Sequence, residues 1–234
     1  MSDDLPCGLS ILMPVYNEVD RIGTALDSTL AVELPCPVEL IVVDDGSTDG
    51  TAEYLRTSEL RGNVRVHFHE RNQGKGAAVR TALADARMRW STIFDADLEY
   101  DPGDLRVVLE PLMCNQDINA VFGVRAFDGS HSHSFWFVLG NRFVTLVGNV
   151  LFNVYLHDLM TCHKGMRTDL FRSLPLREKG FGIEPEIAAR LLRRGEKIYE
   201  VPVQYRARAS EEGKKLSAMD GVRVVRTLIR CRLR

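Results

Sequence analysis

The first 125 residues alternate between short apolar runs and longer segments of mixed composition. The runs have the length and composition of buried strands, and the segments between them have the length of helices. The predicted strands cover residues 9–15, 38–43, 64–68, 91–94 and 120–123. The predicted helices cover roughly residues 18–32, 50–60, 75–89 and 102–115. Such alternation is typical of βαβ units, so we expect an α/β fold with a mostly parallel sheet.

The second half of the chain departs from this alternation. A polar stretch at 126–134 precedes a long apolar segment at 135–156, in which polar side chains recur at every fourth position. These side chains are Asn141, Thr145, Asn149 and Asn153. At 3.6 residues per turn they form one stripe of a helix. Two interpretations stay open: the helix lies in a membrane interface, or it packs on the sheet as an amphipathic core helix.

The last part of the chain predicts a short helix, a strand and a basic helix. They cover residues 184–194, 197–203 and 217–231. Arg223, Arg226 and Arg230 share one face of the last helix, which suits either anionic headgroups or solvent. We expect a domain at 1–216, with halves at about 9–125 and 126–216, and then a basic amphipathic helix at 217–234.

Composition indicates a globular domain, and the charge differs in sign between the first and last parts of the chain. The chain has 234 residues, of which 45% are hydrophobic and 26% are charged, as in ordinary globular domains. Residues 1–60 contain 12 acidic and 2 basic residues, whereas 206–234 contain 3 acidic and 9 basic residues. An acidic first part suits a bound metal, and a basic last part suits an anionic partner.

Cysteine usage and the N-terminus indicate the compartment. Five cysteines without a CxxC pair argue against a disulfide framework or a zinc site and favour a reducing environment. The N-terminal residues lack the apolar core of a signal peptide. No uninterrupted apolar run reaches about 18 residues, so we do not expect a spanning helix.

Acidic residues follow three of the predicted strands. The loops are PVYNE at 14–18, DDGSTDGT at 44–51 and DADLEYDP at 95–102. Ligands of parallel sheets bind at the carboxyl ends of the strands. Carboxylates gathered there repel one another, and a bound cation would relieve that repulsion.

The third loop carries the strongest metal-binding pattern. Asp95 and Asp97 present hard oxygen ligands at short spacing, which suits Mg²⁺ or Mn²⁺ on diphosphate oxygens. Glu99 is a candidate third or water-mediated ligand. Asp45 can accept hydrogen bonds from a base or a ribose. Lys75, in a Gly-Lys-Gly helix start, can bind phosphate oxygens, although these glycines are also a plain helix boundary.

Together these motifs resemble the family 2 glycosyltransferases with the GT-A fold. Within that group the chain is similar to the dolichyl- and polyprenyl-phosphate sugar synthases, of the dolichol-phosphate mannose synthase type. The resemblance rests on PVYNE, DDGSTDGT, RNQGKGAAVRTAL, DADLEYDP, GNRFVTL, DLMTCHKGMR, GFGIEPEIAARLLRRG and EVPVQYRARASEEGKKLSAMDG. It implies a Rossmann-like sheet flanked by helices, with amphipathic C-terminal helices.

The resemblance also implies roles for single residues. The nucleoside would be contacted by Pro14, Tyr16, Glu18 and Asp45. The diphosphate side would hold Lys75 and Asp95, and the metal would be held by Asp95, Asp97 and Glu99. The acceptor phosphate would be received by Arg125 and Arg142, which with Asp97 form the catalytic set. A loop with Arg206, Lys214 and Lys215 would close over the phosphates.

The implied reaction is inverting transfer of a sugar from a nucleotide-diphosphate donor to polyprenyl phosphate. UDP-hexoses, UDP-N-acetylhexosamines and GDP-mannose all fit as donors. A phosphate monoester is already largely an anion at pH 7, so a strong general base is not required. We expect a cytoplasmic protein, peripheral on the inner face of the membrane, that reaches its lipid directly or through an integral membrane partner. No nucleic acid partner is expected.

Two other functions stay open. One is a glycosyltransferase that acts on a hydroxyl acceptor, for which Glu184 and Glu186 are candidate bases. The other is a catalytically silent module that binds a nucleotide sugar. Release of a nucleoside diphosphate on addition of polyprenyl phosphate would exclude the silent module.

Overall fold

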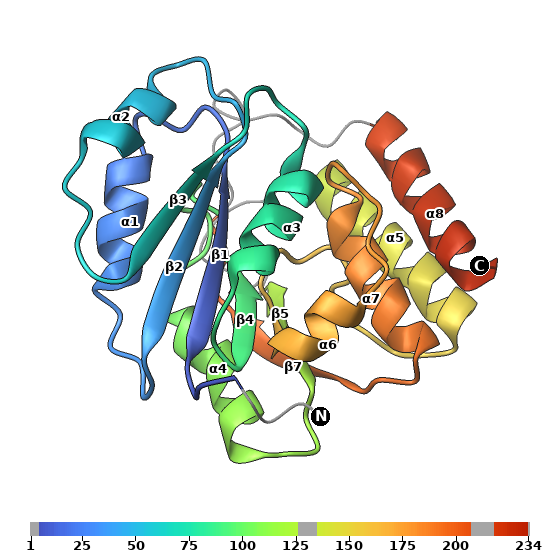
Figure 1. Ribbon diagram of the computed structural model, residues 1–234. Coiled ribbons are helices and arrows are strands. Elements are labelled where there is room, and N and C mark those ends of the chain that lie inside the picture. Colours follow the sequence, from blue (N-terminus) through green and yellow to red (C-terminus); the bar gives the residue numbers. More distant parts are fainter. Residues whose placement is uncertain (1–4, 126–134, 207–217, 234) are drawn as a thin grey trace.

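A twisted sheet runs through the middle of the computed structural model, which describes residues 5–125, 135–206 and 218–233 (Figure 1). Within these residues the sheet has seven strands, in the order β3-β2-β1-β4-β6-β5-β7. The strands are β1 (Leu9–Val15), β2 (Val38–Asp44), β3 (Val64–Phe68), β4 (Trp90–Ile93), β5 (Ala120–Arg125), β6 (Lys164–Arg167) and β7 (Ile198–Val203). All neighbouring strands are parallel except β6, which is antiparallel to β4 and β5.

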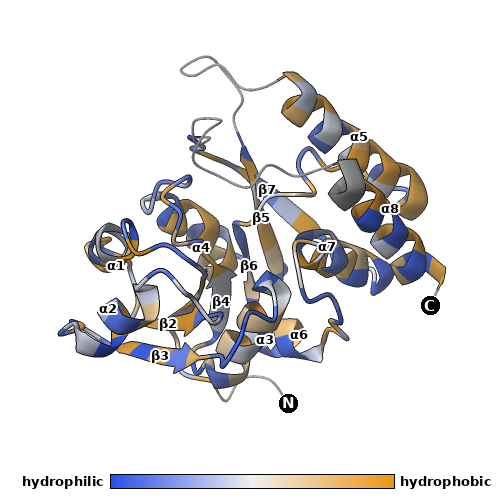
Figure 2. Cartoon of the chain, turned by 90° about the horizontal axis from the view of Figure 1, so that it is seen from above, coloured by the Kyte–Doolittle hydropathy of each residue, from blue (hydrophilic) through white to orange (hydrophobic). Residues whose placement is uncertain are grey.

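Helices cover both faces of the sheet (Figures 1 and 2). They are α1 (Ile22–Leu30), α2 (Thr51–Thr57), α3 (Lys75–Asp85), α4 (Asp104–Cys114), α5 (Phe135–Phe152), α6 (Thr168–Ser173), α7 (Ile183–Arg193) and α8 (Ala218–Leu233). The expected α/β architecture with a mostly parallel sheet is therefore confirmed.

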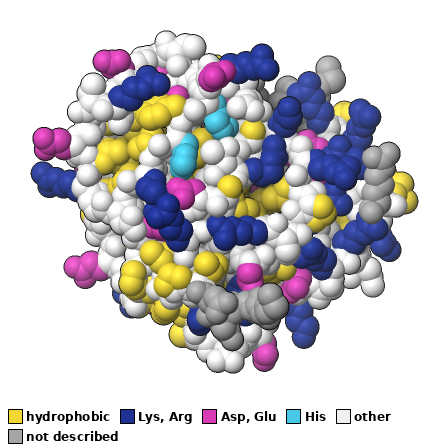
Figure 3. All heavy atoms as spheres, in the orientation of Figure 1, with side chains coloured by type: hydrophobic (Ala, Val, Ile, Leu, Met, Phe, Trp, Pro, Cys, Tyr) yellow, Lys and Arg dark blue, Asp and Glu magenta, His cyan; other side chains and the backbone are white. Residues whose placement is uncertain are grey.

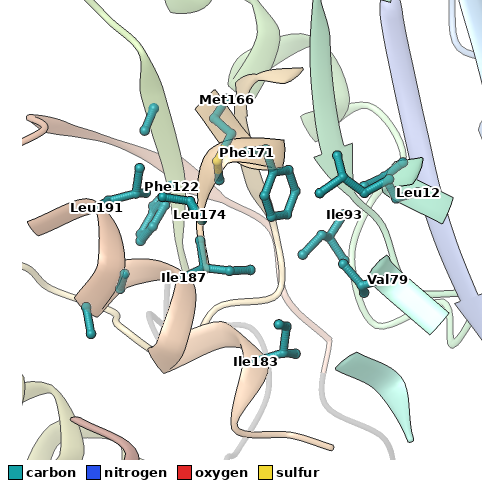
Figure 4. Close-up of a cluster of buried hydrophobic side chains, with 14 of the residues drawn as sticks. Leu12, Val79, Ile93, Phe122, Met166, Phe171, Leu174, Ile183, Ile187 and Leu191 are labelled. Atoms are coloured by element: carbon teal, nitrogen blue, oxygen red, sulfur yellow. The ribbon is translucent and has the colours of Figure 1, made fainter. Parts of the chain in front are cut away.

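Each face of the sheet has its own hydrophobic cluster, because successive strand residues point to opposite faces. Ile11 and Met13 of β1 pack with α1, α2 and α4, whereas Leu12 packs on the face covered by α3, α6 and α7. Figure 4 shows the second cluster, in which Phe122 and Phe171 fill the space between the sheet and α7. The helices α5 and α8 join this second cluster at its outer end.

The structure differs from the sequence prediction in several places: helix α6 was not predicted, and α3 ends at Asp85, before the predicted end at residue 89. Residues 18–21 do not begin the first helix, because the backbone there is hydrogen-bonded to the loop after β2. Strand β6 was not predicted, since KGMR contains two cations and a glycine. The predicted domain boundary at 216 and the polar stretch 126–134 lie outside the described residues, so the domain division stays a prediction.

Helix α5 turns its polar stripe into the protein. Asn141 and Thr145 are buried, and both amide atoms of Asn149 bond the backbone of Leu156. Among the described helices, α5 is long and apolar enough to cross a membrane by length and composition alone. Its outward side is mostly apolar and exposed, with Trp136 at 76%, and it also carries the exposed Arg142. Figure 2 shows that α5 is largely hydrophobic. The helix therefore buries its polar stripe together with Val144 and exposes mostly apolar side chains.

Candidate active site

The loops after β1, β2 and β4 meet at one edge of the sheet. The parallel register sets Val15 beside Asp44, and β4 ends three positions earlier, with Ile93 beside Leu12, so the three chains leave the sheet at the same edge. These are the loops in which the sequence places its acidic residues. The predicted gathering of carboxylates at the carboxyl ends of the strands therefore has its structural basis.

The first two loops are joined by side chain–backbone hydrogen bonds. The backbone N–H of Asn17 donates to the Ser47 hydroxyl at 2.9 Å, and its side-chain oxygen accepts from the Thr48 N–H at 2.8 Å. The N–H of Glu18 donates to the Thr51 hydroxyl at 2.9 Å. Asn17 adopts a left-handed φ of 54°, which asparagine tolerates. These bonds fix the first two loops to each other.

The candidate nucleoside contacts lie on this edge with different exposures. Tyr16 is exposed, while Pro14, in the last part of β1, and Glu18 are half-buried. An exposed ring at a strand end offers a face for stacking on a base. The assignment of these three residues to a nucleoside stays a prediction.

Asp45 is buried and holds the chain that leads to α3. Its Oδ1 accepts hydrogen bonds from the Gln73 N–H at 3.0 Å and pairs with His69 Nδ1 at 2.6 Å. Its Oδ2 accepts from the Gly74 N–H at 2.7 Å. His69 is fixed in turn by the Thr81 hydroxyl at 2.9 Å. Asp45 thus positions the start of α3, and its predicted contact with the nucleoside is not tested.

The Gly-Lys-Gly start of α3 is required by a close approach of two chains. A Cβ atom on Gly74 or Gly76 would overlap the carbonyl oxygens of Lys179 and Glu178. Gly74 also has a φ of 96°, a conformation that other residues rarely adopt. Both glycines are therefore needed to bring segment 178–180, which precedes α7, against the residues that flank Lys75.

Lys75 is enclosed by acidic groups. Its ammonium lies 2.6 Å from Asp95 Oδ2, 2.6 Å from Glu184 Oε1 and 3.1 Å from the sulfur of Cys162. Burial alone would lower the pKa of Lys75, but Asp95, Cys162 and Glu184 raise it well above the usual lysine value. Lys75 therefore stays protonated at the edge of the sheet.

The carboxylates after β4 fit a divalent cation that also binds a diphosphate. Asp95 Oδ1 is buried and has no hydrogen-bond partner within the described residues, an arrangement that is costly without a cation. Asp97 is half-buried two residues later, and its Oδ1 accepts from the Glu99 N–H at 3.1 Å. Mg²⁺ needs only one or two protein carboxylates beside phosphate oxygens and waters. Asp95 and Asp97 supply that number of carboxylates, and their assignment to a metal stays a prediction.

The third predicted ligand is engaged elsewhere in this structure. Glu99 Oε2 accepts a hydrogen bond from the Tyr205 hydroxyl at 2.8 Å, and its carbonyl oxygen accepts from the Arg206 N–H at 2.8 Å. In the described parts of the chain, no group of three His, Cys, Asp or Glu side chains gathers to hold a metal. A metal here would rely on donor phosphates and water, and a role for Glu99 stays a prediction.

These contacts bring Arg206, of the loop predicted to close over the phosphates, close to the loop that carries Asp95 and Asp97. Arg206 is exposed and is tied to the backbone of Glu99. Lys214 and Lys215 lie outside the described residues.

Arg125 ends β5 in a buried ion pair that the sequence did not reveal. Its Nε donates to Asp158 Oδ2 at 2.6 Å, and its Nη2 donates to Asp158 Oδ1 at 2.9 Å and to Asn141 Oδ1 at 3.0 Å. The guanidinium lies over the ring of Tyr205 at 5.1 Å and is only 7% exposed. Burial works to raise the pKa of Asp158, but Arg125 lowers it below the ordinary value.

Arg142 is not brought to the same place as Arg125. It is exposed on α5, while the preceding residue, Asn141, faces inward to Arg125. Consecutive helical residues point about 100° apart, so one of the two faces solvent when the other faces the core. The described contacts give Asn141 a place beside Arg125, and a role for Arg142 with the acceptor phosphate stays a prediction.

The two glutamates of α7 have different surroundings. Glu186 Oε2 accepts from the N–H groups of Arg177 at 2.8 Å and Glu178 at 2.7 Å, and its Oε1 pairs with Arg190 at 3.3 Å. Glu186 therefore holds the loop before α7. Glu184, which is 2% exposed, faces Lys75 instead.

Sequence reasoning gave no site role to Asp158, Asn141 or Cys162 and considered Glu184 only as a base. One signal was present: an arginine that ends an apolar strand is buried, and buried charges are paired. His163 is also buried, edge-on to Phe94, with its pKa lowered to about 4 by desolvation.

Comparison with solved structures identifies the fold class. Glucosyl-3-phosphoglycerate synthase of Mycobacterium tuberculosis, crystallised with Mn²⁺, UDP and glucosyl-3-phosphoglycerate, superimposes with a TM-score of 0.75. The match is 21% identical and covers 96% of this chain and 80% of that chain, so it bears on the fold alone. The sheet and its flanking helices are those of a GT-A domain. The chain belongs to glycosyl transferase family 2, whose family model matches residues 10–174.

Curated relatives include several that act on polyprenyl phosphates. The undecaprenyl-phosphate mannosyltransferase of Micrococcus luteus is 25% identical over 92% of this chain and 90% of its own length. The undecaprenyl-phosphate 4-deoxy-4-formamido-L-arabinose transferase of Pseudomonas aeruginosa is 29% identical over 95% of this chain. Glycosyltransferase AglJ of Haloferax volcanii is 28% identical over 86% of this chain. The chain spans 63% of the length of AglJ and 64% of that of the Pseudomonas protein.

Proposed function

We propose that this chain transfers a sugar, with inversion, from a nucleotide-diphosphate donor to polyprenyl phosphate. The carrying observation is the pairing of a buried ammonium, Lys75, with an incompletely satisfied carboxylate, Asp95, at the carboxyl edge of a parallel sheet. That arrangement suits a diphosphate with its metal. The polyprenyl-phosphate acceptor is supported by the activities named for the Micrococcus and Pseudomonas relatives.

The residues divide the work between donor and acceptor. Lys75 donates hydrogen bonds to diphosphate oxygens, and Tyr16, Pro14, Glu18 and Asp45 lie on the nucleoside side. Asp95 and Asp97 would hold Mg²⁺ or Mn²⁺, which supplies positive charge to the departing nucleoside diphosphate. On the acceptor side, Arg142 is exposed and is a proposed phosphate ligand. Arg125 is proposed beside it, where it would exchange part of its pairing with Asp158 and Asn141 for the phosphate. Arg206 and Lys214 are proposed to close over the donor phosphates.

The acceptor phosphate attacks without a strong base in this proposal, because it is already an anion. The glutamates considered for a hydroxyl acceptor are both occupied. Glu186 accepts two backbone hydrogen bonds and pairs with Arg190, and Glu184 forms an ion pair with Lys75. This arrangement favours a phosphate acceptor over a hydroxyl acceptor.

A transfer assay tests the proposal. Purified protein is mixed with Mn²⁺, undecaprenyl phosphate in detergent and, in turn, UDP-glucose, UDP-N-acetylglucosamine and GDP-mannose. We expect release of the nucleoside diphosphate from one donor, only with the lipid phosphate present, and a product with inverted anomeric configuration by NMR. Release with undecaprenol or water as acceptor would contradict the phosphate assignment, and donor binding without release would indicate a silent module.

We further propose that the outward face of α5 rests in the interface of the inner leaflet on the cytoplasmic side. Phe143 is 58% and Val150 is 74% exposed on this face, which continues the stripe that begins at Trp136. Positively charged side chains crowd the neighbouring surface over α7 and α8 (Figure 3). An apolar stripe bordered by cations suits an anionic lipid surface. The described cysteines are all free, which agrees with a reducing compartment.

Liposome flotation measures this contact. The double substitution Trp136→Ser and Phe143→Ser is expected to weaken binding to vesicles with anionic lipid by about tenfold or more, because two exposed aromatic rings no longer enter the interface. Tyr199→Ser removes an exposed aromatic ring on β7 and serves as the matched control. Unchanged vesicle binding of the double variant would contradict direct contact and favour an integral membrane partner.

A further inference from the structure

The surroundings of Lys75 hold more negative than positive charge. Its ammonium contacts one oxygen of Asp95 and one of Glu184, each at 2.6 Å. The second oxygens, Asp95 Oδ1 and Glu184 Oε2, are buried, and neither has a hydrogen-bond partner in the described ranges 5–125, 135–206 and 218–233. Two carboxylates therefore share direct contact with one ammonium, and each keeps an oxygen without a hydrogen bond.

The two partners of Lys75 differ in what else they can do. Asp95 follows β4 beside Asp97 and is a proposed metal ligand, so it has an alternative cation. Glu184 sits in the first turn of α7, at 2% exposure, and its ion-pair contact in the described structure is with Lys75, while the buried Lys164 acts on it from farther away. When a divalent ion binds Asp95, the ion and the ammonium repel each other across a few ångströms, and that repulsion is strong where water is excluded. Lys75 then competes with the ion for Asp95, whereas Glu184 still pairs with Lys75.

The elements that carry Lys75 and Glu184 are fixed to each other. Segment 178–180 lies against Gly74 and Gly76, and the Ala77 N–H donates to the carbonyl oxygen of Lys179 at 3.2 Å. Helix α7 begins three residues after this segment. The start of α3 is therefore packed against the segment that leads into α7, and this packing holds Lys75 within reach of Glu184.

We propose that Lys75 is the resident counter-ion of Asp95 in the metal-free protein, and that Glu184 is the positioning residue that holds Lys75 when a divalent cation takes its place. This rests on the proposed assignment of Asp95 and Asp97 to the metal. Lys75 then weakens metal binding in the absence of donor, and it strengthens binding of the metal–diphosphate pair. Glu184 acts through Lys75: it draws the ammonium away from Asp95 and aims it at the diphosphate.

Mn²⁺ binding to the full chain, followed by electron paramagnetic resonance without nucleotide, tests the proposal. Lys75→Met is expected to bind Mn²⁺ about tenfold more tightly than the parent protein, and Glu184→Gln about tenfold more weakly, within the usual range of coupling between sites. With UDP present, Lys75→Met is expected to reverse its effect and bind the metal–nucleotide pair more weakly. Asp97→Ala removes a proposed ligand, so the Mn²⁺ that this variant still binds measures binding at other sites on the protein.

The double variant Lys75→Met with Glu184→Gln tests whether Glu184 acts through Lys75 or through its own charge on the metal. If Glu184 acts through Lys75, the second substitution adds less than twofold to the first, whereas independent charges give additive effects. Additive effects, or a weaker Mn²⁺ affinity in Lys75→Met without UDP, would overturn the proposal. Mn²⁺ binding that is equal in the parent and in Asp97→Ala would overturn the metal assignment. None of these measurements uses the lipid, so failed transfer to polyprenyl phosphate is a distinct result.

Discussion

Asp97→Ala is expected to lower the rate of metal-dependent sugar transfer by about a thousandfold or more, because it removes a ligand of the cation that stabilises the leaving diphosphate. The fold is expected to survive. The carboxylate of Asp97 lies just beyond β4, where it is half-buried and accepts the Glu99 N–H. Transfer is measured in chelator-treated buffer with Mn²⁺ added back at increasing concentration.

The matched control for this variant comes from the same loop. Asp101 also accepts a backbone hydrogen bond, from the Gly103 N–H at 2.8 Å, but it precedes α4 and has no proposed metal. Asp101→Ala is expected to keep the parent's dependence on Mn²⁺. Full activity of Asp97→Ala at saturating Mn²⁺ would refute the site assignment.

The second large effect is on stability. Asp158→Asn is expected to lower the free energy of unfolding by about 3–5 kcal/mol, because it leaves the buried guanidinium of Arg125 without its counter-charge. Asp158 is 1% exposed, and both of its oxygens bind Arg125. Chemical denaturation followed by circular dichroism measures the difference.

A surface pair provides the comparison for Asp158→Asn. Asp169 pairs with Arg167 at 3.0 Å, but their side chains are 35% and 29% exposed. Asp169→Asn is expected to cost less than about 1 kcal/mol, as is usual for exposed pairs. Equal costs for the two substitutions would show that the pair of Arg125 and Asp158 is solvated in solution and has no special weight in the fold.

The sequence predicted the first half of the fold well because its strands are apolar and its helices are bounded by turns. It failed at β6, where a lysine occupies a fully buried strand position. Lys164 is accommodated only by tertiary contacts: its ammonium donates to the carbonyl oxygens of Leu159 and Thr161 and lies 3.9 Å from the centre of the Phe122 ring. No local pattern encodes those partners, so periodicity could not find this strand.

The same limit applies to the candidate site. The motif after β4 and the Gly-Lys-Gly helix start were visible, because each is contiguous in the sequence. The partners that fix them are not contiguous: Asp158 is 33 residues from Arg125, and Cys162 is 87 residues from Lys75. Glu184 was noticed as an acid, yet its pairing depends on how α7 packs against α3. Residue types were therefore predictable, and their pairings were not.

Segment 178–180 has a consequence for engineering. Glu178 accepts hydrogen bonds from Thr227 and Arg230 of α8, while its own carbonyl oxygen lies against Gly76, next to Lys75. A chimera that exchanges α8 for a different helix would therefore remove the partners of Glu178. The segment that packs against the start of α3, and so holds Lys75, would be less firmly fixed. Such a chimera needs residues matching Thr227 and Arg230. Without them, we expect the exchange of a peripheral helix to weaken binding at the proposed donor-phosphate site.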